Sequence, residues 1–230
     1  MGSKSLEKVI STTRSVLFDF DGPICEVFAG LPASEVARSL VEVMRGFDKD
    51  LSEKMEGMDF MDALRVSPQG GEGALRAVEE RLVEAELAAV KVAGDPTPGA
   101  VASLKAARES GREVAIVSNN SSECVKEFLA YHNLASLVQE IVGRPAHQPH
   151  RMKPSPYMLL VAANRLGVAP QVCTLVGDSV TDIEAAISAG ATSIGYANRS
   201  GKDISLEKAG ADSVIGSMGT LADTLSRIKI

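Results

Sequence analysis

The stretch SVLFDFDG, residues 15–22, joins an apolar run to two aspartates and a glycine. A short apolar run favours a strand that is buried on both faces of a parallel sheet, so we predict a strand at Ser15–Phe20. The runs Glu113–Ser118 and Cys173–Val176 have the same apolar middle, and each also leads into polar residues. We therefore predict that these three runs form the central strands of the sheet.

Weaker patterns extend this sheet and place helices between its strands. Further strands are expected at Val138–Val142, Ser193–Tyr196 and Ser213–Ile215. Apolar residues at helical spacing predict helices at Pro98–Glu109, Ser122–Tyr131, Ser155–Leu166, Thr181–Ala189, Leu206–Ala209 and Met218–Ile228. Strands that alternate with helices form βαβ units. The sequence therefore predicts an α/β fold with a Rossmann-like, doubly wound parallel sheet.

Residues 24–96 break this alternation, because they contain no convincing strand. Amphipathic patterns there predict three or four helices, at about Ala33–Phe47, Leu51–Leu64 and Gly73–Val92. A helical block inserted after the first strand indicates a small, all-helical cap domain. We therefore predict a core domain of residues 1–23 and 97–230, and a cap domain of residues 24–96.

Charge and composition restrict the partners of the chain. It has 24 basic and 30 acidic residues, a formal net charge of −6, 4% aromatic residues and no tryptophan. These values argue against binding to nucleic acid.

Three distant cysteines, Cys25, Cys124 and Cys173, fit a reducing compartment. No apolar run reaches the ~18 residues of a membrane helix, and the N-terminus shows no signal-peptide core. We expect a cytoplasmic monomer or homodimer without membrane contact.

Polar residues that follow the predicted strands should meet, because ligands of open α/β sheets bind at the carboxyl ends of the strands. Asp19 and Asp21 lie at the end of the first strand, where alternate residues point the same way. Two adjacent carboxylates repel each other, so one can stay ionised as nucleophile and metal ligand while the other holds a proton. Alone, this motif is equally compatible with two turn aspartates.

Three other segments supply complementary groups. Asp178 and Asp182, at a strand-to-helix junction, are hard oxygen ligands that suit Mg²⁺, although Asp178 also suits a helix cap. Ser118 and Asn119 precede a helix and fit either an anion site or an ordinary cap. Lys153 can neutralise a phosphate or lie in solvent. Together the segments provide every group that phosphoryl transfer needs.

The order and spacing of these motifs resemble those of the haloacid dehalogenase-like (HAD) hydrolase superfamily over about residues 14–228. The resemblance rests on Asp19-Phe20-Asp21-Gly22, Ser118, Lys153 and Gly177-Asp178 with Asp182. It implies that Asp19 attacks phosphorus and forms an aspartyl-phosphate, with Asp21 as general acid and base. It also implies that Ser118 and the Asn119 amide bind the phosphoryl group, and that Lys153 steadies it.

The resemblance further implies a Mg²⁺ ion held by Asp19, the backbone carbonyl of Asp21, Asp178 and, through water, Asp182. The dehalogenases of the family lack an acid at the position of Asp21, so this residue points to a phosphatase, similar to phosphoglycolate phosphatase. The long gap between Asp19 and Ser118 matches the helical C1 cap of the family. Such caps usually restrict the substrate to small phosphorylated metabolites.

The substrate is expected to be a small phosphate monoester, such as phosphoglycolate, a sugar phosphate or a nucleotide monophosphate. Arg65 and Gln69 of the predicted cap, together with Arg144, are candidate substrate contacts, although a solvated helix end and a plain turn also explain Arg65 and Gln69. Two alternative functions remain open at this point. One is a phosphomutase of the same fold, and the other is a non-catalytic module that binds phosphorylated ligands.

Overall fold

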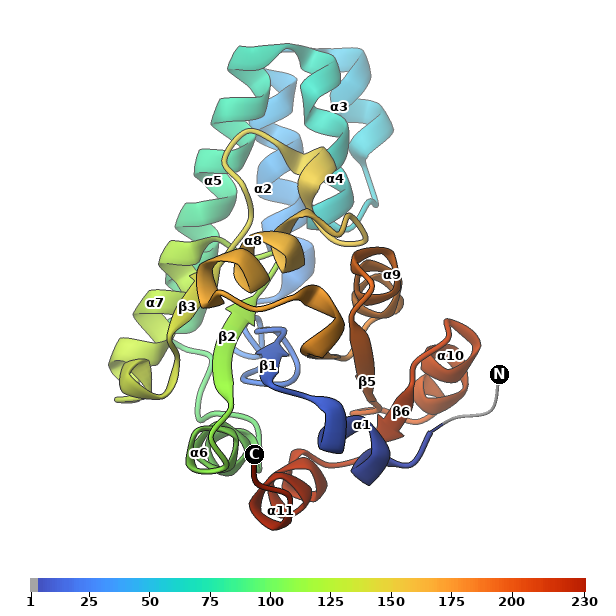
Figure 1. Cartoon of the computed structure of the whole chain (residues 1–230). Helices are drawn as coiled ribbons and strands as arrows, with labels where there is room; N and C mark the ends of the chain where they lie inside the picture. The colour runs from blue at the N-terminus through green and yellow to red at the C-terminus, as the bar shows by residue number, and fades with distance from the viewer. Residues whose placement is uncertain (1–3) are drawn as a thin grey trace.

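The computed structural model describes residues 4–230 and consists of a parallel sheet between two layers of helices, with a helical block on one side (Figure 1). Residues 1–3, the start of the predicted core segment 1–23, lie outside the described residues. Within residues 4–230, no helix is both long enough and apolar enough to cross a membrane.

The sheet contains six parallel strands in the order β3-β2-β1-β4-β5-β6. Their bounds are β1 Ser15–Phe18, β2 Glu113–Val117, β3 Glu140–Val142, β4 Cys173–Gly177, β5 Thr192–Tyr196 and β6 Ser213–Ile215. The chain runs outward from β1 to one edge and then returns to β4 to build the other half. The predicted doubly wound α/β fold is therefore confirmed, and its switch point lies between β1 and β4.

Alternate residues of β1 pack against opposite helical layers, as the pleat of a strand requires. Val16 and Phe18 belong to one apolar cluster, and Leu17 belongs to another. The first layer contains α1 Leu6–Thr12, α6 Ala100–Glu109, α7 Ser122–Tyr131 and α11 Met218–Arg227. The second contains α8 Tyr157–Leu166, α9 Val180–Ala189 and α10 Lys202–Lys208. Short 3₁₀ turns lie at η1 Ser67–Gly70, η2 Ala135–Leu137, η3 Pro149–Arg151 and η4 Pro170–Val172.

Four helices inserted between β1 and α6 form the helical block at the top of Figure 1. They are α2 Ala33–Arg45, α3 Lys49–Met55, α4 Phe60–Val66 and α5 Glu72–Val90. Their apolar faces build a cluster of their own, in which Leu40 and Met44 of α2, Leu64 of α4 and Leu82 of α5 are all buried. The block thus has the separate apolar core that a small domain requires.

The two segments that connect the block to the sheet lie side by side. The backbone N–H of Thr97 donates to the carbonyl of Ile24 (2.8 Å), and its hydroxyl donates to the carbonyl of Gly22 (2.7 Å). The end of α5 reaches past this junction, because Ala89 and Val90 pack in the apolar cluster of the sheet. The division at residues 24 and 96 stays a prediction, and α5 contributes to both apolar clusters.

Several elements differ from the sequence-based expectation, among them α10, which begins at Lys202 and not at Leu206. The chain leaves β1 at Phe18, not at Phe20, because it turns at once into the loop that carries the aspartates. The predicted helix Leu51–Leu64 is two helices, since Gly57 adopts a left-handed conformation (φ 79°) and Asp59 caps a new helix by accepting from Met61 N. The helix α1 was not predicted at all.

Candidate active site

The polar ends of β1, β2 and β4 meet at the switch point of the sheet. Asp19 directly follows β1 and Asp178 directly follows the neighbouring strand β4. The backbone N–H of Asp19 donates to the carbonyl of Val176 (2.8 Å), so strand pairing fixes the position of Asp19. Ser118 follows β2 on the other side of β1. The topology thus brings together residues that are far apart in the sequence.

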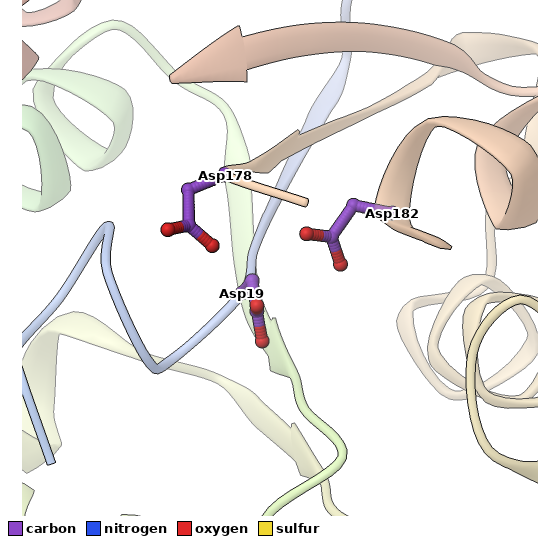
Figure 2. A group of neighbouring side chains, drawn as sticks. All are labelled: Asp19, Asp178 and Asp182. Atoms are coloured by element: carbon purple, nitrogen blue, oxygen red, sulfur yellow. The ribbon is translucent and has the colours of Figure 1, made fainter. Parts of the chain in front are cut away.

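Asp19, Asp178 and Asp182 form a carboxylate cluster, in which one oxygen from each residue lies within 4.8 Å of the others. Figure 2 shows the three side chains converging from the ends of two strands and from the first turn of α9. Asp182 also closes a capping box: Ser179 N and Oγ donate to its Oδ2 (3.0 and 2.6 Å), and Asp182 N donates to Ser179 Oγ (3.3 Å). Its orientation is therefore fixed by the start of the helix.

Lys153 places a positive charge between two of these carboxylates. Its Nζ lies 2.8 Å from Oδ1 of Asp19 and 2.5 Å from Oδ1 of Asp182, and it also donates to the carbonyl of Val117 (3.1 Å). Burial alone would lower the pKa of Lys153, but Asp182 and Asp19 raise it overall, so the ammonium stays charged. Burial and the charge of Asp182 raise the pKa of Asp19, and Lys153 limits that rise.

Two glycines allow the carboxylates to come this close. Gly22 has a φ of 99°, and a Cβ added there would lie 2.6 Å from Cγ of Asp178. A Cβ added at Gly177 would lie 2.4 Å from the side chain of Asp182. Both contacts are closer than real Cβ atoms approach their neighbours, so a side chain at either position would displace a carboxylate of the cluster.

The loop between β2 and α7, residues 118–121 and called here the β2–α7 loop, faces the carboxylate cluster. The backbone N–H of Asn120 donates to Oγ of Ser118 (3.1 Å), and this hydroxyl is also bonded to Oδ1 of Asn120 (3.1 Å). The side chain of Asn119 accepts from Lys153 N (2.8 Å) and donates to Lys153 O (3.3 Å). A hydroxyl and the Asn119 amide before a helix can bind an anion, and Lys153 supplies the matching charge.

Asp21 occupies a different position from the cluster. Its Oδ1 accepts from the backbone N–H of Val27 (2.9 Å), and burial together with the charge of Asp178 raises its pKa to about 6, against the lowering effect of the Val27 N–H. The carboxyl can therefore hold a proton near neutral pH, as a general acid must. Its carboxylate is not a member of the carboxylate cluster, which fits the expectation that only its backbone carbonyl meets a metal.

Two polar partners of Asp178 were not predicted from the sequence. Nδ2 of Asn198 donates to Oδ2 of Asp178 (3.0 Å), and Nζ of Lys202 forms an ion pair with the same oxygen (2.5 Å). Both residues follow β5, the neighbour of β4. The rule that ligands gather at the carboxyl ends of strands could have found them, since the stretch 197–202 directly follows the predicted strand Ser193–Tyr196.

The carboxylate cluster suits a hard divalent cation. Asp19, Asp178 and Asp182 offer oxygen only, and Mg²⁺ prefers a few carboxylates with water completing its coordination. The raised pKa of Asp19 also fits, because a bound cation would compensate the repulsion between buried carboxylates. Asp19, Asp178 and Asp182 are therefore the residues that would hold the ion.

A cavity of about 600 Å³ covers these groups, and helices of the inserted block form its roof. It is lined by Asp19, Asp21, Ser118, Asn119, Lys153 and Asp178, and on the roof by residues that include Phe28, Asp59, Phe60, Met61 and Arg65. The site thus opens into a partly covered cavity that can hold a small molecule.

Of the three residues expected to contact substrate, only Arg65 lines the cavity. Arg65 of α4 lines the cavity, where it donates to Lys153 O (3.0 Å). Gln69 is exposed on η1 and is not among the described residues that line the cavity. The expectation for Arg144 is corrected by its burial: it pairs with Glu79 (3.2 Å) and Glu86 (2.8 Å) away from the cavity lining.

Comparison with known proteins agrees with this geometry. The model of the haloacid dehalogenase-like hydrolase family matches residues 13–190. Phosphoglycolate phosphatase from Escherichia coli (strain K12) is 34% identical over 113 residues, which are 48% of this chain and 44% of that protein. The chain thus spans about half the length of the curated relatives it matches.

Solved structures resemble the chain over nearly its whole length. A HAD family hydrolase from Deinococcus radiodurans R1, with bound phosphate and sodium, has a TM-score of 0.62 and 29% identity, covering 95% of this chain and 97% of that one. β-Phosphoglucomutase from Clostridium difficile shares the fold with a TM-score of 0.65 at 19% identity, covering 94% and 98%. The family match covers strands β1 to β4, the inserted block and every motif of the site, and the chain belongs to the haloacid dehalogenase-like hydrolase family.

Proposed function

We propose that this protein is a Mg²⁺-dependent phosphatase that hydrolyses a small phosphate monoester through an aspartyl-phosphate. The observation that carries the proposal is the position of Asp19 at the switch point, where Lys153 Nζ lies 2.8 Å from its carboxylate and the β2–α7 loop faces it. A buried carboxylate beside a buried ammonium and an anion site is suited to attack a phosphoryl group.

In the proposed first step, a carboxylate oxygen of Asp19 attacks phosphorus, and the bond from phosphorus to the ester oxygen breaks. Asp21 donates its proton to the departing oxygen, so the leaving group departs as a neutral alcohol. Ser118, the Asn119 amide and Lys153 hold the phosphoryl oxygens, which keep their negative charge during transfer. The products of this step are the aspartyl-phosphate and the alcohol.

In the proposed second step, water attacks phosphorus of the aspartyl-phosphate. Asp21, now ionised, accepts a proton from that water, and the bond from phosphorus to the Asp19 oxygen breaks. Inorganic phosphate leaves and both aspartates return to their starting states. The pKa of Asp21, raised to about 6, suits a group that gives and takes a proton in turn.

Bound Mg²⁺ would supply positive charge that neutralises the phosphoryl oxygens and keeps the Asp19 carboxylate ionised. Asp19, Asp178 and Asp182 are the side chains that would hold it. The roof of the cavity would exclude bulk water while Asp19 is phosphorylated. The bound phosphate in the related hydrolase from Deinococcus radiodurans R1 supports phosphate as the ligand of this fold.

The size of the cavity and the relatives support the proposed substrate class. A cavity of about 600 Å³ fits a small ester, and the name of the Escherichia coli relative makes phosphoglycolate the first ester to test, before sugar phosphates and nucleotide monophosphates. We also propose a cytoplasmic location, which is supported by three cysteines that are buried and unpaired.

The proposal is tested with a panel of phosphate monoesters, each assayed with Mg²⁺ and with EDTA. Release of inorganic phosphate is expected from at least one ester, and it should stop when EDTA removes the metal. Asp19→Asn should lower turnover roughly 10⁴-fold or more while the fold is retained. Full activity in Asp19→Asn would overturn the mechanism. Isomerised sugar phosphate without released phosphate would identify a phosphomutase, and tight binding without hydrolysis would identify a binding module.

A further inference from the structure

A buried ion pair outside the cavity holds the β2–α7 loop. Glu86 of α5 and Arg144, which follows β3, lie 2.8 Å apart, and their side chains are 0% and 1% exposed. Neither residue is among the described residues that line the cavity. Removing each of these charges from water costs several kcal/mol of desolvation free energy, which the attraction between the two ions has to offset. The same helix also buries apolar residues, among them Val78, Leu82 and Ala89.

The ion pair contacts each residue of the loop from Asn119 onward. Glu86 accepts from the backbone N–H of Ser121 (3.0 Å) and from Nδ2 of Asn120 (3.3 Å). Arg144 donates from Nη1 to the carbonyl of Asn119 (2.8 Å) and from its backbone N–H to the carbonyl of Asn120 (2.9 Å). The pair thus fixes backbone positions in the loop, not merely the direction of one side chain.

The groups that face the phosphoryl position depend on this backbone. The Ser118 hydroxyl is bonded to both the N–H and the side chain of Asn120 (3.1 Å each). The Asn119 side chain is bonded to both N and O of Lys153 (2.8 and 3.3 Å). A shift of the loop would therefore move the Ser118 hydroxyl, the Asn119 amide and the backbone of Lys153 together.

We propose that Glu86, acting with Arg144, is a positioning residue that holds the β2–α7 loop in the geometry that binds a phosphoryl group. The inserted helical block then helps to build the phosphoryl site as well as covering it, because Glu86 belongs to α5. This inference rests on the proposed function, since it takes the loop to be the phosphoryl site. A displacement of about 1 Å at such a site can lower the rate about 10²-fold.

Glu79 provides a matched control on the same helix. It is also a buried glutamate of α5, and it also pairs with Arg144 (3.2 Å). Its other contacts are with the backbone N–H and with Nδ1 of His147 (2.6 and 3.0 Å), and no hydrogen bond between described residues joins it to the β2–α7 loop. Glu79→Gln therefore removes a buried charge beside Arg144 without removing a bond to the loop.

The experiment compares Glu86→Gln, Glu79→Gln and the unaltered protein, each with Mg²⁺. Calorimetry measures the Kd for inorganic phosphate, p-nitrophenyl phosphate assays give kcat and KM, and thermal unfolding gives Tm. We expect Glu86→Gln to raise the phosphate Kd and to lower kcat/KM by at least about tenfold each. Glu79→Gln should leave both within about twofold of the unaltered protein, even where Tm falls to a similar extent.

The inference is overturned if Glu86→Gln binds phosphate as tightly as the unaltered protein, or if Glu79→Gln weakens phosphate binding equally. If Glu86→Gln does not fold, Arg144→Lys decides the question: it keeps the charge but loses the fork that reaches both Glu86 and Asn119, so the phosphate Kd should still rise. An unchanged Kd in that variant overturns the inference. Absence of ester hydrolysis by the unaltered protein would instead refute the proposed phosphatase, because phosphate binding is measured separately.

Discussion

Nζ of Lys153 lies 2.8 Å from Oδ1 of Asp19, and both side chains are buried at the switch point of the sheet. Burial raises the pKa of Asp19, whereas a nucleophilic carboxylate has to be ionised. Lys153 opposes that rise, and it also contacts Asp182 on its other side. Lys153 thus lowers the pKa of the buried Asp19 carboxyl and places its ammonium between two buried carboxylates.

Lys153→Met should destabilise the protein by about 3–5 kcal/mol at neutral pH, because it leaves Asp19 and Asp182 buried without their cation. The loss should grow as the pH rises. Without Lys153 the pKa of Asp19 in the folded state lies further above its value in the unfolded chain, so the folded state is favoured at low pH and penalised as Asp19 ionises. Urea unfolding without metal at pH 5 and pH 8 measures this difference.

Lys202→Met is the matched control for that variant. Lys202 also pairs with a carboxylate of the cluster, Asp178, but the side chains are 29% and 16% exposed. A partly solvated pair contributes less, so we expect a loss of about 1 kcal/mol or less. Equal losses for the two lysine variants, or a loss for Lys153→Met that does not change with pH, would contradict the role assigned to Lys153.

Gly22→Ala should weaken Mg²⁺ binding, because the added Cβ would lie 2.6 Å from Cγ of Asp178 and push this carboxylate out of the cluster. Gly57→Ala separates this effect from backbone strain. Gly57 has a similar left-handed φ of 79°, but its added Cβ would have no neighbour within 4 Å among the described residues. Both variants should lose about 1 kcal/mol of stability or more. Only Gly22→Ala should raise the Kd for Mg²⁺, measured by calorimetry.

Mg²⁺ should bind more tightly as the pH rises from about 5.5 to 8. The pKa of Asp19 is raised by burial and by Asp182, and a protonated carboxyl is a poor metal ligand. Binding therefore releases protons, and the affinity increases as Asp19 ionises. Calorimetry in two buffers with different heats of ionisation measures both the Kd and the protons released. A Kd that stays constant over this range would show that the ion does not compete with protons at the cluster.

The sequence predicted the sheet and the motifs because they depend on local patterns and on one topological rule. The apolar run before Asp19 and the glycine after Asp21 identify a buried strand and a tight turn without reference to other segments. The rule that strand ends converge then places Asp178 beside Asp19. The break at Gly57 and the short helix α1 were missed, because short helices leave too few turns for a clear period.

Ion pairs between residues far apart in the chain could not be predicted from the sequence. Arg144 was expected to touch substrate because it lies in a loop near Lys153, yet it is buried between Glu79 and Glu86 of α5. Charged residues on a helix are ordinarily exposed to solvent. Nothing in the spacing of these two glutamates indicates an ion-pair partner outside the inserted block. Such pairing depends on how the inserted block lies on the sheet.

Arg112→Met should destabilise the protein without changing its ligand binding. The Arg112 side chain is fully buried and donates to the carbonyls of Ile10, Thr13 and Ile228 and to the Ser110 hydroxyl (2.6–3.0 Å). Methionine fills similar space but leaves these acceptors without donors, so we expect a loss of about 3 kcal/mol or more in urea unfolding. The phosphate Kd should not change, because these contacts surround the start of β1, at the opposite end from Asp19.

Asp21→Asn should impair the hydrolysis of alkyl phosphates far more than that of p-nitrophenyl phosphate. An alkoxide is a poor leaving group and needs a proton from Asp21, whose raised pKa of about 6 keeps part of it protonated near neutral pH, whereas p-nitrophenolate leaves without one. We expect kcat/KM to fall by about 10²-fold or more for the alkyl ester. For the aryl ester, formation of the aspartyl-phosphate in a single turnover should change much less. Asp19→Asn, as the control, should abolish both reactions. Equal losses for the two esters in Asp21→Asn would mean that Asp21 acts on some step other than protonation of the leaving group.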